Sequence, residues 1–199
     1  MDRKSIQAIK MLQRNKIVAF PTETVFALAC DASNSGAVSG VYKIKKRPKD
    51  NPLALFVDSI KQVENVAIIS SGFCKLFEKF SPGPITYVLK KKPDSVLARN
   101  FNPGLDTIAV RFPDHAVAQE IIAGFDGYIA ATSANISGQP PATDSNMLQA
   151  TIGDKIDYII DGKCDIGTAS TIVDLSGGEL KILREGSVTE GDVRSVLLA

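Results

Sequence analysis

The sequence has no tryptophan, a single histidine and only three cysteines. Cys30, Cys74 and Cys164 are widely spaced and form no Cys-x-x-Cys pair, which argues against a disulfide framework and against a zinc site. We therefore expect a reducing, cytoplasmic location. The first residues lead into an amphipathic stretch, and no apolar run approaches the roughly 18 residues that span a bilayer, so we expect neither a secretory signal nor a membrane association.

An excess of charge of one sign is also lacking, because 23 Lys+Arg face 22 Asp+Glu and leave a formal net charge of +1. Attraction to phosphate therefore has to come from local clusters of cations. Hydrophobic residues make up 44% and charged residues 23% of the 199 residues, which is average for a globular protein and excludes a disordered chain. Without repeats or a linker-like stretch, we expect one domain over residues 1–199.

Apolar periodicity predicts helices that alternate with buried strands. A helical period covers residues 5–14, and a short apolar run, 17–20, stops at Pro21. A second pair follows, with a helix over about 38–45 and a strand over 53–57. Further strands are expected at 85–89, 107–112, 128–132, 158–160, 171–175 and 180–183, and further helices at 116–123, 146–152 and 189–198.

The number of strands favours a mixed sheet. Eight or so strands with about six helices are too many for a strictly alternating parallel sheet. We therefore predict an α/β fold: a single-domain, twisted, mixed parallel and antiparallel sheet with flanking helices. At its C-terminal helix, Thr189 followed by Asp192 resembles a capping box.

Two polar segments follow predicted elements early in the chain. Pro-Thr-Glu-Thr begins directly after the first strand, where open α/β sheets place ligand contacts. Taken alone, it is explained better by a turn in which Thr22 or Thr24 caps a helix. Five cations within residues 43–49 would suit phosphate or carboxylate, but a solvated helix C-terminus explains them equally well.

Three later features also lie at strand ends. Residues 132–138 offer hydroxyl and amide donors suited to phosphate oxygens, and the same residues are good turn formers; their place after a strand favours the ligand interpretation. A hairpin at Gly177-Gly178 would bring Ser170 towards Arg184. Arg111 is a further cation at the end of a strand.

Familiar catalytic and nucleotide-binding patterns are absent. No nucleophile and base pair stands out, because the one histidine, His115, follows Pro-Asp at a predicted helix N-terminus, where we expect a surface or capping role. The sequence has neither a Walker loop nor a dinucleotide G-x-G-x-x-G. Any nucleotide would have to be held without these loops.

In this order, the polar segments resemble the YrdC-like family of threonylcarbamoyl-AMP synthases, over nearly all of residues 5–188. Each segment is weak alone, but the ordered set is specific. The matching motifs are Pro21-Thr22-Glu23-Thr24, Lys45-Lys46-Arg47-Pro48, Ser81-Pro82-Gly83-Pro84, Val110-Arg111, Ser133-Ala134-Asn135, Ser170-Thr171 and Arg184-Glu185-Gly186.

The chain departs from the family pattern at two places and lacks a segment of its longer members. Residues 26–29 read Phe-Ala-Leu-Ala in place of the usual Tyr-Gly-Leu-Gly, and Phe56 stands where many members carry histidine near the threonine site. The chain ends soon after Arg184-Glu185-Gly186. It therefore resembles the short, single-domain form of the family.

The resemblance implies a nucleotidyltransferase that uses L-threonine, bicarbonate and ATP, the last with Mg²⁺, to form threonylcarbamoyl-AMP and pyrophosphate for the t6A modification of tRNA. It also implies the t6A transferase machinery as a partner and a possible tRNA contact, with no metal held by the protein. The implied catalytic residues are Lys45, Arg47, Ser133 and Asn135. The implied ATP contacts are Arg47, Asn51, Thr107, Ser133, Pro141 and Arg184, and the implied threonine contacts are Thr24, Arg111, Ser170 and the backbone near Ala131.

Two alternatives stay open at this point. A basic concave surface could grip double-stranded RNA or tRNA through phosphates, although the near-zero net charge and the lack of basic motifs interleaved with aromatics argue against this as the sole function. A paralogue that kept the fold but changed its small substrate is made credible by residues 26–29 and by Phe56.

Overall fold

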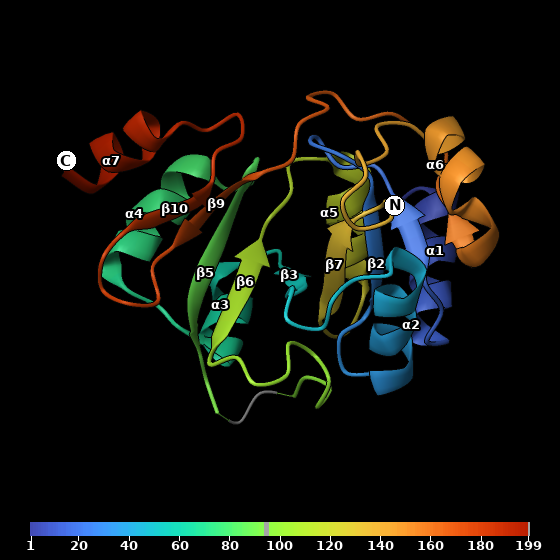
Figure 1. Cartoon of the computed structure of the whole chain (residues 1–199), viewed down its shortest axis with the longest axis horizontal. Coiled ribbons are helices and arrows are strands. Elements are labelled where there is room, and N and C mark those ends of the chain that lie inside the picture. Colours follow the sequence, from blue (N-terminus) through green and yellow to red (C-terminus); the bar gives the residue numbers. More distant parts are fainter. Residues whose placement is uncertain (94–95, 199) are drawn as a thin grey trace.

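The computed structural model describes residues 1–93 and 96–198 (Figure 1). None of the helices in these two ranges is long and apolar enough to cross a membrane. The helices are α1 (Arg3–Gln13), α2 (Ser35–Lys45), α3 (Ile60–Val66), α4 (Ser71–Phe80), α5 (Ala116–Gly124), α6 (Ser145–Thr151) and α7 (Glu190–Leu198), with a 3-10 turn at Gly153–Lys155. The strands are β1 (Val18–Phe20), β2 (Ala27–Asp31), β3 (Ala54–Phe56), β4 (Ala67–Ile68), β5 (Ile85–Lys91), β6 (Thr107–Arg111), β7 (Ile129–Ser133), β8 (Tyr158–Ile159), β9 (Thr171–Asp174) and β10 (Lys181–Arg184).

The strands form one mixed sheet, in the order β10-β9-β5-β6-β3-β7-β2-β1-β8, with β4 paired to β5. Three pairs are parallel, β3 with β6, β5 with β9 and β1 with β8. The remaining pairs are antiparallel. The predicted mixed α/β sheet with flanking helices is therefore confirmed, although it has more strands than expected.

Strand β2 was not predicted from the sequence, and it occupies the place where a helix cap was considered. The Thr22 hydroxyl donates to the Val25 carbonyl at 2.7 Å and accepts from the Val25 amide at 3.3 Å. It thus closes the turn that leads from β1 back into β2, so the capping of a helix by Thr22 or Thr24 is wrong. Because β2 is short, apolar and rich in alanine, its pattern alone does not distinguish helix from strand.

Helix α4 was also missed, although its spacing is helical. Phe73, Leu76 and Phe77 are buried on one side of it, and the Ser70 hydroxyl caps its N-terminus by accepting from the Phe73 amide at 3.2 Å. One local expectation, the capping box of the last helix, is confirmed. Thr189 and Asp192 form the predicted reciprocal capping box, with amide-to-oxygen distances of 2.9 and 3.2 Å.

Of the surface or capping role expected for His115, the capping alternative is wrong. His115 is the N-cap residue of α5, but its side chain makes no cap hydrogen bond. Its Nδ1 atom is buried and has no hydrogen-bond partner within the described part of the chain. An imidazole presents its nitrogens on a ring, which does not reach back to the first amides as a short hydroxyl or carboxylate does.

Two buried clusters flank the sheet. On one face, α1 and α5 pack over β1, β2 and β7, with Leu12, Phe20 and Ile121 among the buried residues (Figure 1). The other cluster includes Leu76 of α4 and Tyr87 of β5, whose hydroxyl donates to the Leu76 carbonyl at 3.0 Å. Because side chains alternate along a strand, the residues next to Tyr87 point to the opposite face. That face carries the cavity described next.

Candidate functional site

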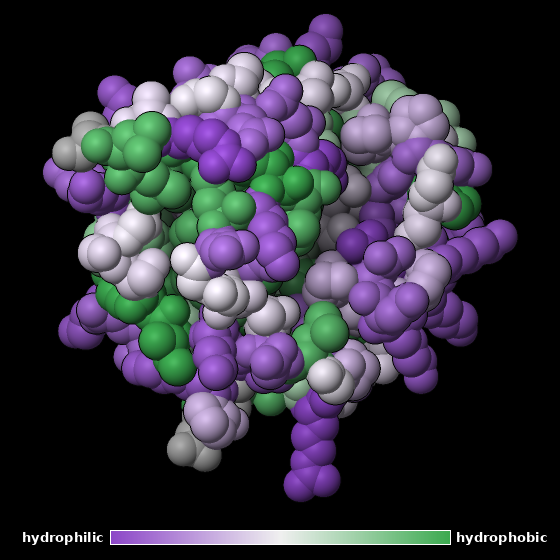
Figure 2. All heavy atoms as spheres, turned by 60° about the vertical axis from the view of Figure 1, so that its left-hand side comes forward, coloured by the Kyte–Doolittle hydropathy of each residue, from purple (hydrophilic) through white to green (hydrophobic). Residues whose placement is uncertain are grey.

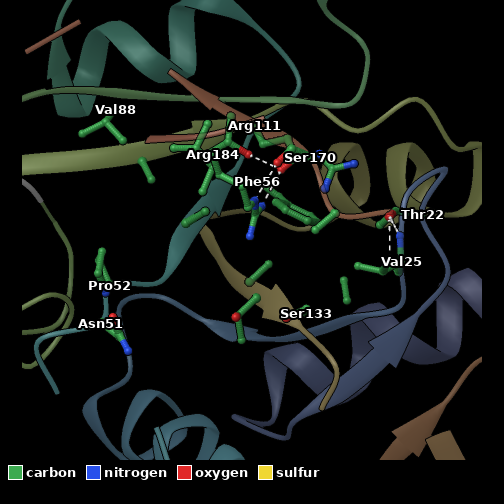
Figure 3. A pocket seen from close by; sticks show the side chains of 18 of the residues that line it. Thr22, Val25, Asn51, Pro52, Phe56, Val88, Arg111, Ser133, Ser170 and Arg184 are labelled. Carbon is green, nitrogen blue, oxygen red and sulfur yellow. Dashed lines mark hydrogen bonds between the residues drawn. The ribbon is translucent and has the colours of Figure 1, made fainter. Parts of the chain in front are cut away.

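A cavity of about 330 Å³ lies between β5, β6, β9 and β10 on one side and β2, β3 and β7 on the other. Figure 3 shows Arg111, Arg184 and Ser170 close together beside Phe56, with Asn51 and Ser133 across the opening. The surface on the side of β9 and β10 mixes hydrophobic groups with hydrophilic ones (Figure 2). Small apolar residues and hydroxyl groups fill the rest of the wall.

Arg111 ends β6 and is held by a buried ion pair. One of its terminal nitrogens lies 2.8 Å from a Glu23 carboxylate oxygen and donates to the Thr24 hydroxyl at 2.7 Å, and both charged side chains are only 7% exposed. The centre of the guanidinium lies 5.7 Å from the Phe56 ring centroid. Its Nε has no partner in residues 1–93 and 96–198. The group is therefore fixed in place with donors left over for an anion.

Arg184 reaches the same region from β10. Its Nε donates to the Ser170 carbonyl at 2.9 Å, and a terminal nitrogen donates to the Ser170 hydroxyl at 3.3 Å. That hydroxyl also lies 2.8 Å from the Thr86 hydroxyl of β5. The predicted approach of Ser170 and Arg184 through the β9–β10 hairpin is confirmed, and a chain of polar groups crosses three strands.

Close packing of the backbone explains why residue 186, two positions after Arg184, is a glycine. A Cβ atom at this position would lie 2.4 Å from the Ala169 carbonyl oxygen, so a side chain here would force the backbone apart. The Gly186 amide instead donates to the Thr171 hydroxyl at 2.9 Å. This close contact fixes the end of β10 against the start of β9 and so sets Arg184 over the cavity.

Arg47 enters from the opposite side, on the segment between α2 and β3. It donates to the carbonyls of Asn51 and Pro52 at 3.1 and 2.9 Å. Burial lowers the pKa of Arg47 below its usual value. Burial, followed by the positive charges of Arg111 and Arg47, lowers the pKa of Arg184. The three guanidinium groups are thus close enough for their positive charges to repel one another, and an anion in the cavity would reduce this repulsion.

Lys45 is completely buried and does not line the cavity. Its ammonium group donates to the Ser133 carbonyl, to the Asn135 carbonyl at 3.0 Å and to the Asn135 side-chain oxygen at 2.7 Å. Burial, with a smaller effect from Arg47, lowers the pKa of Lys45 to about 7. Lys45, which the resemblance implied to be catalytic, therefore holds the loop after β7 in place from outside the lining of the cavity.

The loop after β7 is built on the same contacts. The Ser133 hydroxyl donates to the Asn135 side-chain oxygen at 2.8 Å, and the Asn135 amide group donates to the Gln139 carbonyl at 2.5 Å. These bonds leave Ser133 facing the cavity while Asn135 stays buried behind it. The contacts with Lys45 and Asn135 thus hold Ser133 at the wall of the cavity.

The residues expected at the site fall into two groups. The structure brings together in one wall Arg47, Asn51, Arg111, Ala131, Ser133, Ser170 and Arg184. It does not bring to that wall Thr24, Lys45, Thr107, Asn135 and Pro141. Thr24 lies behind Arg111 as its hydrogen-bond partner, and Thr107 is at the far end of β6 from Arg111.

Sequence reasoning missed two hydroxyl groups in the wall, Thr22 and Thr86. Thr22 lies in a segment noted for possible ligand contacts, but it was interpreted as a turn or cap residue and was not named as a contact. Thr86 could have been found from alternation, because it lies between the apolar residues Ile85 and Tyr87 on β5 and so faces away from the core. No group of three or more His, Cys, Asp or Glu that could hold a metal ion occurs in residues 1–93 and 96–198.

Known proteins are similar to this chain in sequence and in fold. The family model Sua5_yciO_yrdC, described as "Telomere recombination", matches residues 10–186. The threonylcarbamoyl-AMP synthase of Bacillus subtilis (strain 168) is 37% identical over 98% of this chain and 57% of its own length. A putative threonylcarbamoyl-AMP synthase of Methanocaldococcus jannaschii is 33% identical, and the match covers 90% of this chain and 84% of that protein.

A solved structure agrees with these sequence matches. The crystal structure of Pyrococcus abyssi Sua5 complexed with L-threonine superposes with a TM-score of 0.91 at 39% identity, over 96% of this chain and 56% of that one. The chain therefore spans a little over half the length of the Bacillus and Pyrococcus relatives. From the family model and these relatives together, the chain belongs to the Sua5/YciO/YrdC family.

Proposed function

We propose that this chain is an L-threonylcarbamoyladenylate synthase, a nucleotidyltransferase that makes threonylcarbamoyl-AMP and pyrophosphate from L-threonine, bicarbonate and ATP. The observation that carries the proposal is the convergence of Arg47, Arg111 and Arg184 around one cavity. ATP and bicarbonate are anions and threonine carries a carboxylate, so three guanidinium groups facing one space suit a carboxylate beside a triphosphate. The names of the relatives support the same reaction.

The threonine carboxylate would bind at the Arg111 end of the cavity. Arg111 is held rigidly by Glu23 and Thr24, so its free donors are oriented before a ligand arrives. The Ser170 hydroxyl lies in the same part of the wall. The backbone near Ala131 would then take the amine. In this arrangement Thr24 contributes through Arg111 rather than by touching threonine.

ATP would occupy the side between Arg47 and Arg184. Asn51 and Ser133 line the wall near Arg47 and offer polar groups to the phosphates. Thr107 and Pro141 lie outside the wall, so they would meet ATP only where it extends beyond the cavity. Lys45 and Asn135 would support the reaction by holding Ser133 in place.

The reaction then needs little covalent catalysis by the protein. The neutral amine of threonine adds to carbon dioxide with loss of a proton, or to bicarbonate with loss of water, and an oxygen of the resulting carbamate displaces pyrophosphate at the α-phosphorus of ATP. Positioning and stabilisation of charge dominate such a displacement, and fixed guanidinium groups in a partly closed cavity supply both. The product would pass to a transferase that modifies tRNA.

The residues that line the cavity do not form a magnesium site. No carboxylate lines the cavity, and the described residues hold no cluster of acidic ligands. Magnesium binds through a few oxygens and keeps several waters, so it would arrive on the triphosphate as part of the substrate. None of the steps above depends on its geometry.

The test is release of pyrophosphate from ATP by the purified chain. Turnover should require both L-threonine and bicarbonate, and Lys45→Ala and Arg184→Ala should nearly abolish it. Lys75→Ala, an exposed lysine on α4, is the matched control and should keep full activity. ATP consumption that ignores threonine would count decisively against the proposal.

A changed amino-acid substrate is the second candidate, and Phe56 is the observation that favours it. The Phe56 ring lines the cavity beside Arg111, so the amino-acid end has an apolar wall there. An apolar pocket distinguishes a hydroxyl from a methyl group only weakly, by about 100-fold. Running the same assay with valine and serine, in the wild type and in Phe56→His, decides between the two candidates.

A further inference from the structure

A second cavity, of about 520 Å³, lies on the outer side of α2. Its wall is formed by the C-terminal half of α2, the segment that follows it, and the loop around Arg99. Four of the lining residues are cations: Lys43, Arg47, Lys49 and Arg99. The described residues that line this cavity include no carboxylate.

These four cations are not paired with acidic groups. Within residues 1–93 and 96–198, none of them takes part in a salt bridge. Gathering like charges around one hollow is unfavourable, because the positive charges repel one another. An anion bound among them would remove this cost. Solvated lysines scattered over a surface would not converge on one cavity in this way.

The wall of the second cavity is held by hydrogen bonds. The side-chain amide of Asn100 donates to the Ser35 carbonyl at 2.9 Å and to the Ser39 hydroxyl at 2.8 Å, which ties the Arg99 loop to α2. The Tyr42 hydroxyl donates to the Asn51 carbonyl at 3.2 Å. The cavity is therefore preorganised, so little ordering is required when a ligand binds.

Arg47 lines both cavities. Its Nε and one terminal nitrogen are already used by the Asn51 and Pro52 carbonyls, which hold the guanidinium between the two spaces. A charge in either cavity would therefore be felt by the same group. This links the second cavity physically to the site described above.

We propose that the second cavity binds an anion with two or more linked phosphoryl groups, such as inorganic pyrophosphate or the phosphate tail of a nucleotide. Arginine supplies a planar fork and lysine a point charge, and both are common partners of phosphate oxygens. Four cations around one open hollow suit a compact polyanion. Proteins that bind nucleic acids typically have a basic stripe and a strongly positive net charge, whereas this chain has a net charge of only +1.

The experiment is a titration of the ¹⁵N-labelled full chain with sodium pyrophosphate, followed by amide NMR. We expect saturable shifts in the resonances of residues 39–43 and 99–102. Lys49→Ala/Arg99→Ala should bind at least about tenfold more weakly at these resonances, because two charge-assisted contacts are lost. Both residues are exposed, so the double variant should fold, and Lys75→Ala should bind as the wild type does.

Several results would overturn the proposal. They are the absence of shifts at residues 39–43 and 99–102, an equal loss in Lys75→Ala, and inorganic phosphate binding as tightly as pyrophosphate. A short RNA duplex that moved the same resonances at lower concentration would assign the cavity to nucleic acid instead. The titration measures binding and needs no turnover, so its result is independent of the result of the threonine-dependent assay.

Discussion

Replacing Lys45 with methionine should destabilise the protein, and the size of the effect should depend on pH. Methionine keeps the length and apolar stem of lysine but cannot donate a hydrogen bond. The Ser133 and Asn135 carbonyls would lose their ammonium donor, whereas the Asn135 side-chain oxygen would still accept from the Ser133 hydroxyl. Leaving about two buried acceptors without this donor costs about 2–4 kcal/mol.

The pH dependence follows from the lowered pKa of Lys45. Burial lowers this pKa from its ordinary value of 10.5 to about 7 in the folded chain. Between these two values the unfolded chain holds a proton that the folded chain has released, so stability rises with pH across this window. The rise is roughly 1 kcal/mol per pH unit, and it is lost as the pH falls through 7. Methionine does not titrate, so the variant lacks this contribution.

The assay is urea denaturation followed by far-ultraviolet circular dichroism, which suits a chain without tryptophan. Unfolding free energies of the wild type and Lys45→Met are compared from pH 6 to pH 9. The difference in unfolding free energy between the wild type and Lys45→Met should increase above pH 7. Lys75→Met, the same change at an exposed position, should show the same pH dependence as the wild type. Parallel curves for Lys45→Met would refute the reasoning about its buried amine.

Substitutions at three other positions test contacts that hold the fold together. Arg111→Met should cost about 3–5 kcal/mol of unfolding free energy, because it leaves the buried Glu23 carboxylate without its partner; a loss below 1 kcal/mol would contradict this. Asn102→Ala should cost about 2–4 kcal/mol, since the side chain bonds both the amide and the carbonyl of Leu53 and the residue has a φ of 49°. Asn102→Gly removes the same bonds without the backbone strain and should therefore lose less than alanine does, by about 1 kcal/mol. Thr189→Ala should lower stability by about 1 kcal/mol through the lost cap of α7, and an unchanged urea midpoint would contradict that.

Much of the fold could be predicted because the signals are local. The strand at residues 85–89 is a run of apolar and β-branched residues, and the Thr189 capping box needs only residues three apart. The hairpin that brings Ser170 to Arg184 is set by the Gly177-Gly178 turn between them. In each case neighbours along the chain carry the whole preference, so the sequence pattern is sufficient.

The parts that could not be predicted depend on distant partners. Strand β2 lies between β1 and β7, and its pairing with Ser133 and its neighbours joins residues that are far apart in the chain. An alanine-rich segment has no strong preference of its own, so the neighbouring strands decide its conformation. The same holds for Lys45, which the charge pattern placed on a basic surface and the fold placed in the interior.

The sequence by itself determined most of the elements and the polar groups that stand at their ends, because periodicity and turn chemistry act over a few residues. Only the tertiary structure decided which of those groups share a cavity. Arg111 meets Glu23 and Lys45 meets Asn135 across separations of 88 and 90 residues. Such pairings depend on how the strands are ordered in the sheet, and that order is set by burial and hydrogen bonding of the whole chain rather than by any local pattern.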